Sequence, residues 1–420
     1  MEIKKAFKFR LVPTPDQAAV FRQMAGNTRF IYNHLLEKSI ELHEASGKFA
    51  LGQSLSNMIP KMKEEFSFLK LSYSQSLQAS AENLGKAFVN KFVHKTHGFP
   101  KFKKKNYEDS FTYKQNWILG RKSIVLPKIG RIRMIKHRPI EGRARTVTIS
   151  QDGDQWFASI LCIVQVPDPP VFSDEENFIG IDVGIKEFAV LSTGEVVPNP
   201  KFMKTWRKKV RRFQRKLSKK KDGSKNRDRA KKKLQRVHRK IRRQRQDFHD
   251  KVSRSIIAKC SGVALENLNI QGMMKNHHLA GAIQDCAWGG FTRRITYKAE
   301  WAGKPAVKVD RWCPSTKMCS SCGGIQTMKL SDRVYICGSC GFILDRDLNS
   351  ALNIRAEGLI ILRGTLDLGT VSMFYLPVDG GEGTGQRPVT ACGEVGSGPG
   401  FPGAKLASGK QEEEAGGPPR

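Results

Sequence analysis

The chain has 420 residues, which is enough for two or three domains with their own apolar cores. Its 73 lysines and arginines outnumber 39 aspartates and glutamates, so the formal net charge is +34. Such a charge repels itself unless a polyanion neutralises it, and nucleic acid is therefore the expected partner. A membrane-spanning protein is excluded because the apolar runs are shorter than the ~18–20 residues that cross a bilayer. We also expect no small-molecule substrate.

The cysteines and the first residues indicate the compartment. Met1–Arg10 is charged and is not followed by the apolar stretch of a secretory signal. Four of the nine cysteines form two C-x₂-C pairs, a pattern typical of metal thiolates in a reducing compartment and not of a disulfide scaffold. We expect a cytoplasmic, nucleoid-associated protein of a prokaryote.

Residues 14–95 have the pattern of a helical domain. Thr14 to Gln17 reads T-P-D-Q, a capping box with proline at the first helical position. A second amphipathic stretch runs from about Gln75 to Phe92. Gln75 and Gln78 at its start could reach nucleic-acid bases, although an exposed glutamine on a helix is usually only solvated.

A basic aromatic segment follows at His97–Lys105, with the sequence H-G-F-P-K-F-K-K-K. Glycine and proline end the preceding helix. The segment is either a solvated loop or a surface where the aromatic rings stack on bases and Lys101 and Lys103 contact phosphates. The sequence favours neither interpretation.

Short runs of β-forming residues fill the segment from Phe111 to Val166 and indicate a small antiparallel barrel. The runs are Ile124–Leu126, Ile132–Ile135, Arg145–Ile149 and Trp156–Val166. Asp168-Pro169-Pro170 then forms a stiff linker.

A very basic segment lies between Lys204 and Arg245, with 23 lysines and arginines against two aspartates. A disordered tail is one explanation. We favour two antiparallel helices, because apolar residues recur at helical spacing on each side of the turn Asp222-Gly223-Ser224. Before it they are Trp206, Val210, Phe213 and Leu217, and after it they are Leu234, Val237 and Ile241. The outward residues that we expect to contact phosphates are Arg207, Arg211, Arg215, Arg239 and Arg243.

Four thiols have the spacing of a zinc ribbon. Cys319 and Cys322 form one C-x₂-C knuckle, and Cys337 and Cys340 form a second one after fourteen residues. Two such knuckles can close a tetrahedral Cys₄ zinc site.

Three acids end a predicted strand or begin a predicted helix. Residues 178–191 read as two strands joined by a turn, and Asp182 lies at the end of the first. Glu266 follows the strand Gly262–Leu265. The strand Ala306–Val309 leads into the cysteine-rich segment, and Asp347 opens a short closing helix after that segment. Clustered carboxylates repel one another unless cations join them, so they indicate Mg²⁺ or Mn²⁺. A pair of such ions can promote the hydrolysis of a phosphodiester, because they stabilise both the attacking and the leaving oxygen.

Five motifs occur in a fixed order: F-I-G-I-D-V-G-I-K (178–186), V-A-L-E-N-L (263–268), D-C-A-W-G-G-F (285–291), C-P-S-T-K-M-C-S-S-C-G (313–323) and D-R-D-L-N-S-A-L-N-I (345–354). With them the chain resembles the TnpB/OrfB proteins of insertion sequences, which are relatives of type V CRISPR effectors. The resemblance extends over residues 1–356 and is most specific from residue 178 onward.

The resemblance implies a multidomain α+β fold with an RNase H-like RuvC α/β nuclease domain at residues 171–312 and 341–356. A zinc-ribbon module at residues 313–340, which would bind target nucleic acid, is inserted in it. In the RuvC pattern the catalytic, metal-binding acids are Asp182, Glu266 and Asp347. Asp345 competes for the third place, but the D-x-N pattern favours Asp347.

The first half would hold a wedge-type β-barrel at residues 1–13 and 96–170. The helical recognition domain, residues 14–95, would be inserted in it. Beyond about Leu376 the chain is rich in glycine, proline and glutamate with few apolar residues, and we expect residues 357–420 to be mostly disordered.

The function implied by the resemblance is RNA-guided cleavage of double-stranded DNA beside a short adjacent motif. The guide RNA would come from the element's own end, and base pairing would read the target. A nuclease-silent, RNA-guided DNA-binding repressor is one alternative, disfavoured because all three acids are present. A transposase that performs strand transfer is another, and the sequence separates it poorly.

Overall fold

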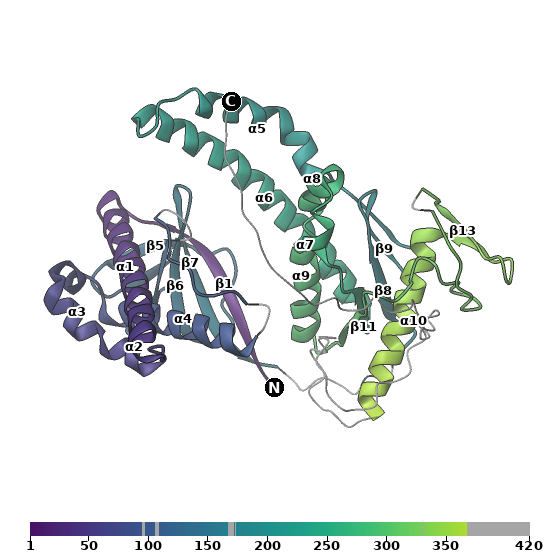
Figure 1. Ribbon diagram of the computed structural model, residues 1–420, viewed down its shortest axis with the longest axis horizontal. Coiled ribbons are helices and arrows are strands. Elements are labelled where there is room, and N and C mark those ends of the chain that lie inside the picture. Colours follow the sequence, from purple (N-terminus) through teal and green to yellow (C-terminus); the bar gives the residue numbers. More distant parts are fainter. Residues whose placement is uncertain (95–96, 106–108, 167–171, 173, 330, 368–420) are drawn as a thin grey trace, which may run out of the picture. The chain divides into compact units, whose positions relative to one another are not determined.

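The structure is a computed structural model that describes residues 1–94, 97–105, 109–166, 172, 174–329 and 331–367 (Figure 1). The chain separates into two units. The first contains Met1–Asn177, Val197–Gly262 and Ile270–Ala306, and the second contains Phe178–Val196, Val263–Asn269 and the chain from Val307 onward. The linker expected at Asp168-Pro169-Pro170 lies outside the described residues.

An antiparallel sheet forms the centre of the first unit. Its seven strands, in hydrogen-bonded order, are β2 (Ser110–Tyr113), β6 (Arg143–Asp152), β7 (Gln155–Gln165), β1 (Glu2–Val12), β5 (Gly130–Ile135), β4 (Ser123–Leu126) and β3 (Ile118–Leu119). The four strands expected from the sequence are β4 to β7. The added strand β1 pairs with β7 from Glu2–Gln165 to Leu11–Trp156, and its side chains alternate between the core and solvent.

In the hydrogen-bonded order of this sheet, β2 and β3 are the two end strands. The antiparallel strand pairing agrees with the expectation, and the closure of the sheet into a barrel stays a prediction. Tyr113 on end strand β2 donates a hydrogen bond to the carbonyl of Pro127, which follows β4 (3.0 Å). One apolar core covers the sheet, and residues of β2, β4 and β7 all contribute to it.

Helix α1 (Pro15–Ser46) joins the sheet to the other N-terminal helices. Thr14 and Gln17 form the expected capping box. Phe21 and Met24 of α1 pack in the core of the sheet, whereas Leu35 packs with Leu84 of α4 in a second core. The helical elements after α1 are α2 (Gln53–Asn57), α3 (Ile59–Glu65), the 3₁₀ helix η1 (Ser67–Leu71) and α4 (Ser74–Val93).

The basic segment forms the expected pair of helices, α5 (Phe202–Ser218) and α6 (Lys225–Lys259). Val210, Val237 and Ile241 fill the seam between them, and Ser224 caps α6. Helix α6 continues 14 residues beyond Arg245 and packs against α9 (Trp288–Trp301). It is followed along the chain by β11 and then by α7 (Ile270–Met273) and α8 (His277–Cys286).

The hairpin and α7 to α9 belong to the first unit, although we expected residues 171–312 to form part of one nuclease domain. Ion pairs explain this difference. Arg239 pairs with Asp154 (2.6 Å) and Arg242 with Asp152 (2.6 Å), so α6 is fastened to the turn between β6 and β7.

A second sheet organises the second unit, with α10 (Arg346–Asp367) packed against β8. Its order is β10 (Val196–Pro198), β9 (Glu187–Leu191), β8 (Phe178–Val183), β11 (Gly262–Glu266) and β12 (Ala306–Val309). A small antiparallel ribbon, β13 (Val334–Ile336) with β14 (Ile343–Asp345), precedes α10.

Helix α10 is longer than the short closing helix that we expected. Leu359 and Leu362 continue its buried face, so the helix runs for 22 residues. Residues 357–367, which we had assigned to a disordered tail, are therefore helical. The remainder of that predicted tail, residues 368–420, lies outside the described residues.

Two glycines allow α10 to lie close to the sheet. A Cβ atom on Gly180 of β8 would collide with the backbone of α10 at Arg355, and one on Gly358 would collide with Ala264 of β11. This close approach fixes α10, and with it Asp347, relative to β8 and β11.

Candidate functional site

The three acids expected at the catalytic centre all lie in the second unit. Asp182 is the next-to-last residue of β8, Glu266 is the last residue of β11, and Asp347 is the second residue of α10. Because β8 and β11 are neighbours in the sheet and α10 packs against β8, three remote segments bring the acids to one place.

The electrostatics of Asp182 reflect this proximity. Burial raises the pKa of Asp182 well above its ordinary value, and the carboxylates of Glu266 and Asp347 raise it further. Burial also raises the pKa of Glu266. A divalent cation fits such a site because its charge favours the ionised forms of the acids.

Two buried serines connect the acids. Ser315 donates a hydrogen bond from its hydroxyl to Glu266 Oε1 (2.6 Å), and the Ser350 and Ser315 hydroxyls lie 3.1 Å apart. Ser350 also hydrogen-bonds to Asp182, which lowers the pKa of that acid in opposition to its burial. The serines thus orient two carboxylates that come from different strands.

Asp347 is held by arginines. Arg346 donates to its Oδ1 from Nε (3.0 Å) and Nη2 (2.7 Å), and Arg333 Nη1 lies 3.8 Å from its Oδ2. Within the described residues the oxygens of the three acids do not all lie within 4.8 Å of one another. A shared cation would therefore require Asp347 to exchange an arginine for the ion.

Asp345 has a different task. Its Oδ1 accepts hydrogen bonds from the backbone amides of Asp347 (2.9 Å) and Leu348 (3.0 Å), which is the geometry of a helix N-cap. The carboxylate of Asp345 is thus used to start α10. This favours Asp347 over Asp345 as the third acid.

The four cysteines of the ribbon converge on one point. Their sulfurs all lie within 4.8 Å of one another, with Cys319 and Cys340 at 3.8 Å and Cys322 and Cys337 at 3.6 Å. Four sulfurs at ~2.3 Å from one zinc ion in a tetrahedron would be about 3.8 Å apart. The cluster therefore fits zinc.

Helix α10 also holds the first knuckle of the ribbon. Asn349 donates to the carbonyl of Met318 (2.7 Å) and accepts from the amide of Ser320 (2.9 Å). Asn353, one turn later, donates to the carbonyls of Ser315 (2.8 Å) and Met318 (2.6 Å). The cysteine site and the acid on α10 are thus connected by a buried polar network.

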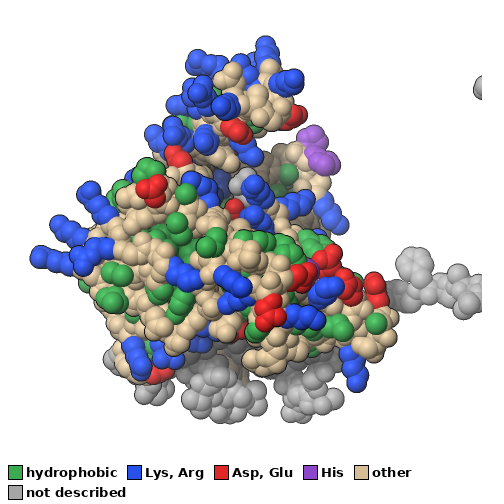
Figure 2. Space-filling view, turned by 90° about the vertical axis from the view of Figure 1, so that its left-hand side faces the viewer, with side chains coloured by type: hydrophobic (Ala, Val, Ile, Leu, Met, Phe, Trp, Pro, Cys, Tyr) green, Lys and Arg blue, Asp and Glu red, His purple; other side chains and the backbone are tan. Residues whose placement is uncertain are grey.

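The predicted phosphate-binding arginines separate into two groups. Arg207, Arg211 and Arg215 are exposed, and the last two line a groove of about 480 Å³ on α5. Figure 2 shows lysine and arginine side chains crowded over the top of the molecule, where Figure 1 places α5 and α6. A continuous row of cations on one helix is suited to a phosphate backbone.

Arg239 was wrongly assigned to the outer face. It is 8% exposed, pairs with Asp154 and donates to the carbonyl of Asp152 (2.7 Å), because its face of α6 lies against the turn between β6 and β7. Arg243 is exposed, donates to Gln155 (2.6 Å) and lies 5.8 Å from the ring of Phe157.

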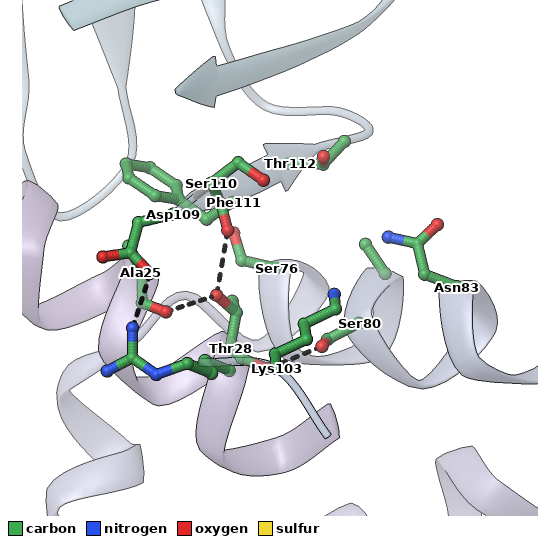
Figure 3. Close-up of a pocket in the computed structure, with 12 residues that line it drawn as sticks. Ala25, Thr28, Ser76, Ser80, Asn83, Lys103, Asp109, Ser110, Phe111 and Thr112 are labelled. Carbon is green, nitrogen blue, oxygen red and sulfur yellow. Dashed lines mark hydrogen bonds and ion pairs between the residues drawn. The ribbon is translucent and has the colours of Figure 1, made fainter. Parts of the chain in front are cut away.

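Of the glutamines and lysines predicted to contact nucleic acid, one lines a polar pocket between α1, α4 and β2 (Figure 3). Gln78 is exposed, and Gln75 is partly buried. Lys103 lines the pocket, and its ammonium group lies 4.0 Å from the ring of Tyr32. Lys101 is exposed but does not line the pocket.

Sequence reasoning missed the groove between the first sheet and α6. This cavity of about 1250 Å³ is lined by Lys8, Arg10 and Arg242, among others. The alternating lysines and arginines of residues 2–12 could have indicated it. Ser315 and Ser350 were also missed, because a serine carries no distinctive sequence signal.

Family models match three parts of the chain. Residues 161–277 match one described as "Probable transposase", residues 288–354 match "Cas12f1-like, TNB domain", and residues 1–48 match "Helix-turn-helix domain". In the structure, residues 1–48 form strand β1 and the single long helix α1. No helix in the described part of the chain is long and apolar enough to cross a membrane.

Curated relatives match most of the chain. It is 35% identical over 367 residues to a Streptomyces pristinaespiralis protein named "Putative RNA-guided DNA endonuclease", covering 85% of this chain and 90% of that protein. It is 32% identical over 383 residues to "Putative RNA-guided DNA endonuclease InsQ" of Escherichia coli K12, covering 86% and 94%.

A solved structure shares the fold. A Cas12f1 chain, solved in complex with sgRNA and target DNA, matches with a TM-score of 0.56 and 14% identity over 84% of this chain and 99% of that one. The chain therefore belongs to the TnpB/OrfB family, as its five motifs indicated.

Proposed function

We propose that this protein is an RNA-guided DNA endonuclease of a transposable element, which cleaves double-stranded DNA beside a short adjacent motif. Its partners are a guide RNA from the element's own end and the target DNA. The proposal rests on the closeness of Asp182, Glu266 and Asp347 in the second unit. Burial of Asp182, followed by the charges of Glu266 and Asp347, raises the pKa of Asp182. The names of the curated relatives support guide RNA and DNA as partners.

The three acids would hold Mg²⁺ or Mn²⁺ in a RuvC-type centre, where a pair of such ions activates water and stabilises the leaving oxygen. The protein's own part is to position these acids. Ser315 donates a hydrogen bond to Glu266 and Ser350 hydrogen-bonds to Asp182, so these serines would orient the two carboxylates toward a cation. Arg346 hydrogen-bonds to Asp347 and would have to release this carboxylate for a cation to bind there.

The zinc ribbon and the basic helices would hold the nucleic acids. The ribbon, with zinc on its four cysteines, is placed by Asn349 and Asn353 directly before the third acid, so its engagement with target DNA is coupled to that acid. Arginines on α5 would contact phosphates without reading sequence.

Strand transfer is the second candidate, because the model matched by residues 161–277 is described as "Probable transposase". The same acids could serve a 3′-hydroxyl nucleophile instead of water. The two activities differ in their products, since transfer yields joined DNA and hydrolysis yields ends.

The decisive experiment uses the full chain co-expressed with its element. RNA that co-purifies with the protein is sequenced, and the complex is incubated with plasmids that carry the matching target beside randomised flanks. We expect cuts only with Mg²⁺ or Mn²⁺, only beside one flank motif, and only when the target matches the RNA. Cutting that ignores the RNA sequence would contradict guided cleavage, and joined products would support strand transfer.

A further inference from the structure

A further cavity lies between α1 and the segment 97–105. It has a volume of about 280 Å³ and shares only Arg29 with the pocket of Figure 3. Its walls combine aromatic rings with polar groups, from Arg29, Phe30, Asn33, His34, Glu37 and Phe102. Ligand pockets for small molecules begin at roughly 300 Å³, so this cavity has room for a single flat group.

One wall is a braced aromatic surface on α1. The rings of Phe30 and His34 are stacked, with centroids 5.7 Å apart and planes at 10°. The rings of Phe66 and Phe68 each form a T-shaped pair with Phe30, with centroid distances of 4.9 and 5.2 Å. The wall is therefore preorganised, and a ligand that stacks on it loses little side-chain entropy from the protein.

Phe102 also lines the cavity, and its side chain is 54% exposed although phenylalanine is usually buried. Its position is set by the next residue. Asn33 donates to the carbonyl of Lys103 (3.0 Å) and accepts from its amide (2.7 Å), so the backbone of this segment is fastened to α1. Phe102 is thus held at the cavity by a fixed backbone.

The charges at this cavity suit a nucleotide. Lys101, Lys104 and Lys105 are exposed on the same segment as Phe102. Glu37 at the rim, 3.6 Å from His34, offers a carboxylate to the N–H groups of a base or to a ribose hydroxyl. Aromatic rings interleaved with lysines are the chemistry that binds single-stranded nucleic acid, by stacking and by phosphate contact.

We propose that this cavity binds one unpaired base of the guide RNA, inserted between Phe102 and Phe30, with the adjoining phosphates on the lysines of segment 97–105. The inference depends on the proposed function, which supplies a single-stranded RNA. Target DNA is a weaker candidate because its bases are paired and stacked in the duplex. The proposal resolves the two interpretations of the sequence H-G-F-P-K-F-K-K-K in favour of a binding surface.

The test measures the affinity of the full chain for its own guide RNA at several salt concentrations. Phe102→Ala should weaken binding about tenfold, since the stacking of a base on this ring is lost. It should leave the dependence of log affinity on log salt unchanged. Replacing Lys101, Lys104 and Lys105 with glutamine should instead reduce that slope by roughly 0.7 for each phosphate that the protein no longer neutralises.

Two further variants control for folding and for exposure. Phe102→Trp keeps a stacking ring and should retain the parental affinity. Phe92→Ala removes a ring that is 56% exposed on α4 but does not line the cavity, and should change the affinity less than twofold. Equal affinities for the Phe102→Ala and Phe92→Ala proteins would overturn the inference and leave guided cleavage intact. A reduction confined to single-stranded DNA would overturn the assignment to RNA, and a parent protein that binds no RNA would overturn the proposed function itself.

Discussion

The acid centre of the second unit and the basic face of α5 are built on opposite plans. The centre uses three carboxylates from β8, β11 and α10, and burial, followed by repulsion from the other two carboxylates, raises the pKa of Asp182. The basic face repeats one kind of charge along a single helix, with Arg211, Arg212 and Arg215 in one open groove. We therefore expect the replacement of a single acid to abolish cleavage, whereas the replacement of a single arginine on α5 should lower the affinity for nucleic acid by only a fraction.

The largest expected effect comes from the third acid. Asp347→Asn should reduce cleavage by more than the roughly 10–100-fold cost of removing a residue that only orients a metal ligand. Guide-RNA affinity should stay within twofold, because Asp347 contacts no phosphate in the proposal. Both quantities are measured on the same preparation, with cleavage under single-turnover conditions.

Asp345→Asn is the matched control for this substitution. Asparagine caps a helix as well as aspartate does, so α10 should start normally and cleavage should persist. If the Asp345 variant were inactive and the Asp347 variant active, the assignment of the third acid would be reversed.

The next effect tests the coupling between the ribbon and α10. Cys337→Ser should lower zinc from about one ion per chain and reduce cleavage roughly 10–100-fold, because the ribbon is too small to fold without its metal and holds Asn349 and Asn353. RNA affinity should change much less. Elemental analysis and cleavage rates measure both changes.

Cys322→His serves as the control, since histidine can replace one thiolate in a zinc site and Cys322 is exposed. This variant should keep its zinc and most of its activity. A zinc-free Cys337→Ser protein that cuts at the parental rate would show that the ribbon is not coupled to the acids.

The sequence predicted the acid centre better than the basic face, for a physical reason. Asp182 and Glu266 lie at the ends of two apolar strands, so the hydrophobic pattern of the sequence was enough to place each acid at the end of a strand. Arg239 lies in a segment where almost every residue is basic, and no pattern separates the face that meets Asp154 from the face that meets solvent. The choice between Asp345 and Asp347 required the hydrogen bonds of the cap.

The extent of α10 was misjudged for a different reason. We expected the closing helix to end near residue 356, but it continues through Gly358, where a Cβ atom would collide with Ala264 of β11. The long-range contact overrides the low helix propensity of glycine.

The pH dependence should also separate the two regions. The pKa of Asp182 is raised, so protons compete with the cation at a higher pH than for an ordinary aspartate. As the pH falls through this raised pKa, the Mg²⁺ concentration for half-maximal cleavage should rise, by about tenfold per pH unit. Arginine keeps its charge across this range, so guide-RNA affinity should remain flat. A parallel decline of both activities would point to unfolding instead.

The smallest effect per residue is expected on α5. Replacing Arg211, Arg212, Arg215 and Lys219 with glutamine should reduce the slope of log affinity against log salt by roughly 0.7–0.9 for each phosphate that is no longer neutralised. Cleavage by complexes saturated with RNA and DNA should remain, because the acids are untouched. The control is Arg236→Gln on α6, because the charge of Arg236 is already paired with Asp154. This aspartate partly neutralises it, so the control should change the slope less for each residue replaced. An unchanged slope in the α5 variant would mean that this face is only solvated, and the groove on α5 would then have no part in binding nucleic acid.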